Sequence, residues 1–131
     1  MDSKPLMILV AGPYRSGTND DPVLIQKNVD AMNETALHLY RMGHLPVLGE
    51  WFALPLIETA GSKQTGDAIF NSLFHPVAIR LISFCDAVLR IGGASQGADD
   101  MVRIGREHGK VIFSDLGEIP VTEHLQGKGP V

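Results

Sequence analysis

The stretch LMILVAGPYRSG, residues 6–17, decides the fold class of this chain. Its first part is a continuous apolar run, and its second part is rich in glycine and in residues that favour turns. A continuous apolar run bounded by glycine is typical of a strand buried on both faces of a parallel sheet. We therefore expect a central strand over residues 6–12 and, after it, a loop that either reverses the chain or holds an anion.

Three further segments have the composition of buried strands. Residues 87–93, AVLRIGG, repeat the apolar run that ends at glycine. Residues 44–49 and 110–115, HLPVLG and KVIFSD, are shorter versions of the same pattern. The sequence therefore predicts four strands.

Between these strands the apolar residues take a helical period. One face of a helix is predicted by the spacing of five apolar residues, namely Ile25, Val29, Met32, Ala36 and Leu39. The pair Asp21 and Pro22 predicts the start of this helix, and Gly43 predicts its end. A second helix is expected over residues 67–85, bent or split by Pro76, and a third from Ala98 to Gly109.

Strands that alternate with helices predict an α/β fold: a single doubly wound, mostly parallel sheet of the Rossmann or flavodoxin type, flanked by helices. We expect residues 1–120 to form one domain and the polar, glycine-rich residues 121–131 to form a loose C-terminal tail. Ligands bind such sheets beyond the carboxyl ends of the strands. Three loops, GPYRSG, GEWFALP and GGASQGAD, are expected to meet at that edge.

The composition excludes several classes of protein. Apolar residues make up 44% of the 131 residues and charged residues 20%, as in a globular domain. A net charge of −4, a pI near 5.6 and the lack of a Lys/Arg cluster argue against nucleic acid as a partner. A single cysteine, Cys85, and the absence of a long apolar segment predict a cytoplasmic protein without a membrane association.

Two of the three loops have features of a phosphate site. The loop GGASQGADD leads into a helix, whose free N–H groups favour an anion, and Ser95 adds a hydroxyl donor. Arg15, flanked by Ser16 and Gly17, suits a bidentate contact with a phosphate. The alternative is that Ser95 or Asp99 only caps the helix and the glycines only form the turn.

The residues on both sides of this edge carry a family resemblance. ILVAGPYRSG and CDAVLRIGGASQGADDMVRIGREHGKVIF resemble the two signatures of the nucleoside 2-deoxyribosyltransferase superfamily, nearest to the branch that hydrolyses nucleoside 5′-monophosphates. The resemblance implies a nucleotide-like ligand, no metal or organic cofactor, and a homo-oligomer. It also implies a set of phosphate-binding residues: Gly12, Arg15, Ser16, Gly17, Ser95 and Gly97.

The chain departs from the family at both catalytic carboxylates. The position of the nucleophilic Glu is Met101, and the position of the supporting Asp is Ala78. We therefore expect either an enzyme that cleaves or transfers the N-glycosidic bond with other acids, or a nucleotide-binding sensor that has lost its acids. No metal site is expected, because the five histidines lack metal-ligand spacing.

Four residues are candidates for the catalytic role: Glu50, Asp99, Asp100 and Tyr14. Glu50, beside Trp51, would have a raised pKa if it is buried, which suits a general acid. In the alternative, Glu50 is a plain loop residue, Asp99 and Asp100 are a helix-start charge and a solvated acid, and Tyr14 packs under its loop. Trp51 and Phe52 either stack a base or cover the core. Among the histidines, only His75 has a path to the cleft.

Overall fold

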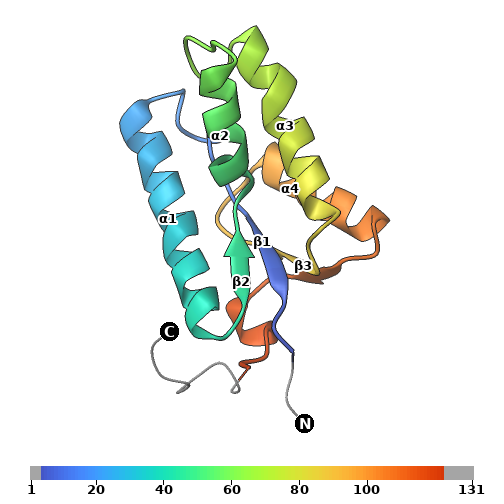
Figure 1. Ribbon diagram of the computed structural model, residues 1–131. Helices are drawn as coiled ribbons and strands as arrows, with labels where there is room; N and C mark the ends of the chain where they lie inside the picture. Colours follow the sequence, from blue (N-terminus) through green and yellow to red (C-terminus); the bar gives the residue numbers. More distant parts are fainter. Residues whose placement is uncertain (1–3, 123–131) are drawn as a thin grey trace, which may run out of the picture.

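The computed structural model describes residues 4–122 (Figure 1). Strands alternate with helices along this part of the chain. The elements are β1 (Met7–Ala11), α1 (Pro22–Arg41), β2 (Leu45–Val47), α2 (Gly49–Thr59), α3 (Ala68–Ile82), β3 (Ala87–Arg90), α4 (Gln96–Glu107), β4 (Val111–Phe113) and the 3₁₀ helix η1 (Leu116–Glu118).

The four strands form one all-parallel sheet in the order β2-β1-β3-β4. Leu9 of β1 lies opposite Val47 on one side and Val88 on the other. From β1 the chain first adds β2 at one side and then crosses to add β3 at the other. The predicted doubly wound α/β fold is therefore confirmed, and its switch point lies between β1 and β3.

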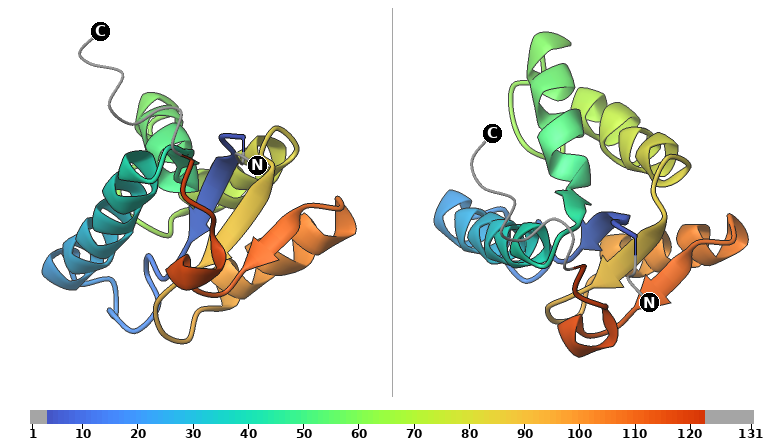
Figure 2. Two further views of the ribbon diagram at one scale, coloured as in Figure 1. Left: turned by 90° about the horizontal axis from the view of Figure 1, so that it is seen from below. Right: turned by 60° about the horizontal axis from the view of Figure 1, so that its bottom comes forward.

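The two faces of the sheet are covered by different helices. Leu9 and Ala11 pack with α3 and α4, while Ile8 and Val10, which alternate with them along β1, pack with α1. Figure 2 shows the sheet between these helices. Helix α2 follows directly from the end of β2 and lies beside α3, with which it forms a smaller apolar cluster (Figure 1).

The helix starts follow local chemistry. Asp21 caps α1 by accepting a hydrogen bond from the Val23 N–H at 2.9 Å, and Pro22 is the first helical residue, as predicted. Ser95 caps α4 in the same way, with the Ala98 N–H 3.2 Å from its Oγ. This helix therefore begins at Gln96, two residues before the expected start.

Two helix predictions need correction. GEWFALP is not a loop, because residues 49–55 form the first part of α2. Nor does Pro76 split α3, which continues from Ala68 to Ile82. Both helices contain an internal proline and pack against each other, so tertiary packing compensates for the hydrogen bond that each proline cannot donate.

The described part of the chain is still packed at its last residue, Thr122. Thr122 is fully buried, and its N–H and hydroxyl both donate to the Met42 carbonyl, at 2.8 and 3.2 Å. Thr122, the second residue of the predicted tail, therefore packs on the end of α1, while Val121 is exposed. The rest of that tail, residues 123–131, lies outside the described residues. Within residues 4–122 no helix has the length and apolar character needed to cross a membrane.

Candidate active site

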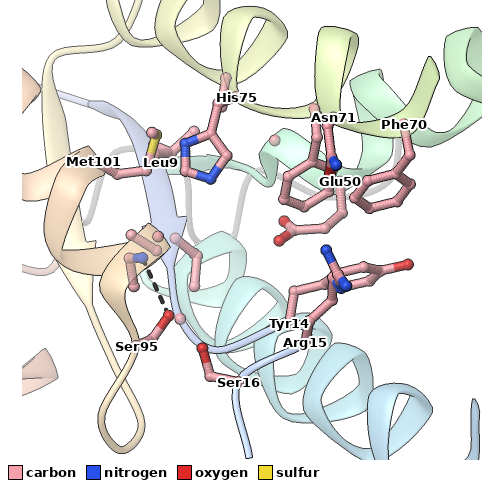
Figure 3. A pocket seen from close by; sticks show the side chains of 18 residues that line it. Leu9, Tyr14, Arg15, Ser16, Glu50, Phe70, Asn71, His75, Ser95 and Met101 are labelled. Atoms are coloured by element: carbon pink, nitrogen blue, oxygen red, sulfur yellow. Dashed lines mark hydrogen bonds between the residues drawn. The ribbon is translucent and has the colours of Figure 1, made fainter. Parts of the chain in front are cut away.

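A cleft of about 430 Å³ opens at the carboxyl end of β1 (Figure 3). Its walls come from the loop after β1, the first turn of α2, one side of α3 and the first turns of α4. This is the edge beside the switch point, where ligands bind in doubly wound sheets. The predicted meeting of the three loops is therefore found, with the second of them replaced by the start of α2.

Glu50 is the acid of this cleft. Its carboxylate points into the cavity (Figure 3), and within residues 4–122 no other carboxylate lines it. Burial raises the pKa of Glu50 from about 4.5 to about 7, although a hydrogen bond from its own backbone N–H acts in the opposite direction. The carboxyl is thus able to give or take a proton near neutral pH.

A close helix contact holds Glu50 in this position. Gly49 begins α2, and a Cβ at that residue would lie 3.0 Å from the Cβ of Ala78 on α3. The missing side chain lets the first turn of α2 approach α3. Glu50, the next residue, is thereby directed into the cleft between the two helices.

An aromatic wall stands beside Glu50. The Phe70 and Phe74 rings stack with centroids 4.8 Å apart, and the Tyr14 ring lies 5.2 Å from Phe74. The pKa of Tyr14 is raised, first by burial and then by the negative charge of Glu50. Tyr14, a candidate from the sequence, therefore lines the cleft as a neutral hydroxyl.

Sequence reasoning missed the contribution of α3 to this wall. In the sequence of this helix, Ile69, Leu73, Val77 and Leu81 are four residues apart and suggest an apolar face that leaves Phe70 and Phe74 off the buried side. In the structure α3 packs on the sheet with one side and on α2 with another, so its apolar residues are not confined to one stripe. The spacing of Phe70 and Phe74, four residues apart, was the available signal.

The opposite end of the cleft offers hydrogen-bond donors. Gly12, Ser16, Ser95 and Gly97 all line it, and the labelled serines lie near each other in Figure 3. Ser95 is buried, and its Oγ accepts the Ala98 N–H. Both interpretations of Ser95 are therefore compatible with its position, since it caps α4 and also faces the cavity.

Arg15 lines the cleft at its other end, beside the aromatic wall. Its guanidinium lies 5.6 Å from the Phe70 ring centroid and donates two hydrogen bonds to Asp20, at 2.7 and 2.9 Å. This contact lowers the pKa of Asp20. In this arrangement Asp20 occupies the guanidinium fork that the sequence assigned to a phosphate.

Five of the predicted site residues lie outside the lining of the cleft. Asp99 is exposed and accepts a hydrogen bond from Arg90 Nε at 3.0 Å, and Asp100 accepts one from the Gln96 side chain. Trp51 and Phe52 are 44% and 45% exposed on α2. The Trp51 indole instead donates to Asn33 Oδ1 on α1. Gly17 is exposed in the loop after Arg15.

The two positions that carry carboxylates in the resembling family both line the cleft. Met101 is buried at the start of α4, and Ala78 is buried on α3. Neither side chain can ionise, so the cleft has apolar groups at these places and an acid at position 50. Within the described residues, no group of three His, Cys, Asp or Glu side chains is arranged to hold a metal ion.

Comparison with known proteins does not assign this chain to a family. No protein-family model matches the chain, and no curated protein matches it in sequence. The assignment of the site therefore depends on the chemistry of its own residues.

Proposed function

We propose that this protein is an enzyme of nucleotide metabolism that cleaves or transfers the N-glycosidic bond of a nucleoside 5′-monophosphate. The observation that carries the proposal is Glu50, a carboxyl whose pKa burial raises to about 7, inside a cleft with an aromatic wall at one end and hydroxyl donors at the other. An acid poised near neutral pH is what the departing base requires, because its ring nitrogen must receive a proton or carry negative charge.

The three regions of the cleft fit the three parts of a nucleotide. The base is planar and apolar on its faces and would lie against Tyr14 and Phe74. The sugar would lie beside Glu50. The 5′-phosphate would accept hydrogen bonds from Ser16 and from the N–H groups at the start of α4, near Gly97.

Arg15 would join this phosphate site by releasing Asp20 and turning from the aromatic end of the cleft toward Ser16, its neighbour in the loop. Its present partner Asp20 is exposed, so the pair is a surface ion pair of small net stability. A phosphate bound in the cleft would compete with Asp20 for the same guanidinium fork. This role for Arg15 explains why an arginine stands in the loop after β1 without a buried partner.

A nucleotide-binding sensor of the same fold is the second candidate. The observation that favours it is the pair of apolar residues, Ala78 and Met101, at the positions where the resembling family has its carboxylates. Such a protein would keep the binding cleft and would not turn over its ligand.

We further propose that the protein is located in the cytoplasm and forms a homo-oligomer. The buried thiol of Cys85 favours a reducing compartment. Exposed apolar side chains on α1, β2 and α2 favour association between copies; they are Leu37, Tyr40, Leu45, Trp51, Phe52 and Leu56. Sedimentation of the full chain measures this association.

The test is to incubate the protein with a panel of ribo- and deoxyribonucleoside 5′-monophosphates and to measure the release of free base by chromatography. The wild type should release base from at least one of them. Glu50→Gln should reduce the rate by roughly 10²- to 10⁴-fold. Glu58→Gln, on the same helix and exposed, is the matched control and should keep full activity. Binding without release would decide for the sensor, and full activity of Glu50→Gln would remove Glu50 from the mechanism.

A further inference from the structure

His75 is the one imidazole that lines the cleft within residues 4–122. Its ring points into the cavity from α3, and the carboxylate of Glu50 points into the same cavity from α2 (Figure 3). Room for the ring comes from Gly97, where a Cβ would lie 3.3 Å from His75 Nε2. The cleft thus contains an imidazole and a carboxyl that face one ligand volume.

The hydrogen bonds of His75 differ from those of a structural histidine in the same chain. His44 is buried, its Nδ1 accepts the Leu6 N–H at 3.0 Å, and its Nε2 is 2.6 Å from the Pro120 carbonyl. His75 is partly exposed, and no hydrogen bond within residues 4–122 involves either of its ring nitrogens. A ring packed beside Phe74 with both nitrogens free is available to a ligand.

Few other charged groups face His75. Of the titratable side chains that line the cleft, the loop after β1 contributes Tyr14 and Arg15, α2 contributes Glu50, and α4 contributes none. Arg15 is paired with Asp20, and Tyr14 remains a neutral hydroxyl. Glu50 and His75 are therefore the two groups of this set that are free to exchange protons with a ligand.

Hydrolysis of a glycosidic bond ordinarily uses two such groups, an acid for the leaving group and a base or nucleophile on the sugar. The cleft has one carboxylate, so the second group has to be of another type. Resting on the proposed function, we infer that His75 is the general base that activates water, while Glu50 is the general acid.

The proposed step balances as follows. The oxygen of water forms a bond to the anomeric carbon, and the bond from that carbon to the base nitrogen breaks, with its electron pair going to the nitrogen. That nitrogen receives the proton of Glu50, and His75 receives a proton from the water. The products are the free base and the sugar 5-phosphate, and solvent then returns the proton from His75 to Glu50.

The test is steady-state hydrolysis, between pH 5 and 9, of a nucleotide that the wild type cleaves. His75→Gln should lower kcat by roughly 10²- to 10⁴-fold with little change in KM, because the base acts in the chemical step. The acid limb of the pH–rate profile should disappear in this variant, because the general base is absent, while the alkaline limb, which reports the loss of the Glu50 proton, should remain. His108→Gln, an exposed histidine at the end of α4, is the control and should behave as the wild type.

A second variant distinguishes a chemical role of His75 from a role in packing. His75→Ala leaves a space beside Gly97, and added imidazole should restore part of its activity, which a purely structural role does not allow. Wild-type activity with an unchanged acid limb in His75→Gln would overturn this inference and leave the proposed function in place. Absence of base release by the wild type from every nucleotide would overturn both.

Discussion

Glu50 illustrates, at the scale of one residue, how burial outweighs a favourable local position. It lies in the first turn of α2, where the helix dipole favours a negative charge by about 0.3–1 kcal/mol, and its own N–H stabilises the carboxylate further. Desolvation is larger than both, because the pKa is raised to about 7. The guanidinium of Arg15, which lines the same cleft, is engaged by Asp20 and does not reverse this balance.

The raised pKa makes a prediction about stability. The folded protein binds the Glu50 proton more tightly than the unfolded chain does. The contribution of this proton to the free energy of unfolding is therefore complete below about pH 4.5 and is lost as the pH rises to about 7. Glu50→Gln does not titrate. The free energy of unfolding of Glu50→Gln, measured relative to that of the wild type, should therefore increase by roughly 2–3 kcal/mol between pH 5 and pH 8.5. Urea unfolding of both proteins measures it, and an advantage that is the same at both pH values would show that Glu50 is solvated.

Arg15 gives a second prediction at this scale. Asp20→Asn weakens the competitor for the guanidinium while keeping a residue that tolerates the local φ of 59°. The affinity for a nucleoside 5′-monophosphate should rise several-fold, and the affinity for the nucleoside should not change. Arg15→Ala should weaken nucleotide binding by roughly 10- to 100-fold, since a hydrogen bond to a charged group contributes about 1.5–3 kcal/mol. Calorimetric titration measures both, and equal effects on nucleotide and nucleoside would place the phosphate elsewhere.

At the scale of elements, the sequence predicted those segments whose pattern is set by burial in the sheet. All four strands and helices α1, α3 and α4 were predicted, because the strands are apolar runs and α1 has a single apolar face. Helix α2 was missed. It lacks a side-chain cap at its start, contains Pro55 and is apolar on more than one side. The two sequence signals of a helix, a capping residue and a single apolar face, were therefore both weak.

The same reasoning explains which site residues were found. Residues in loops at strand ends, such as Arg15, Ser16 and Ser95, were recognisable because the fold class fixes where such loops lie. Asp99 and Asp100 were candidates on sequence distance alone, and the helical turn directs them to Arg90 and Gln96 instead. Phe74 required knowledge of how α3 packs on α2, which a single-helix pattern does not contain.

The turn between α1 and β2 provides a prediction about the fold. Gly43 has a φ of 101°, and a Cβ there would lie 1.7 Å from Thr122 Oγ1. Gly43→Ala should lower the free energy of unfolding by on the order of 3 kcal/mol, from backbone strain and a buried clash together. Gly61→Ala, with a φ of 96° and open space around it, is the control for strain and should lower it by about 1 kcal/mol. Equal effects in urea unfolding would mean that the segment ending at Thr122 is not packed on this turn.

At the scale of the whole molecule, the switch between β1 and β3 accounts for the position of the cleft. Because the chain adds β2 at one side of β1 and β3 at the other, the helices that follow β1 and β3 run to opposite faces of the sheet and leave a crevice between their loops at its carboxyl edge. Helices α3 and α4 then supply the walls from one face of the sheet, and α2 supplies Glu50. The fold provides the cavity, and its side chains provide the acid, the aromatic wall and the hydrogen-bond donors on which the proposed nucleotide site depends.

The most direct test of this account is where a nucleotide binds. Glu50→Gln protein labelled with ¹⁵N is titrated with a nucleoside 5′-monophosphate, and its amide signals are followed by NMR; the substitution is expected to slow turnover during the titration. We expect saturable shifts at Ser16, Gly97 and Ala98, which line the cleft, and unchanged signals at Asn33 and Leu37 in the separate groove between α1 and α2. Saturable shifts confined to that groove, or none with any nucleotide, would contradict it.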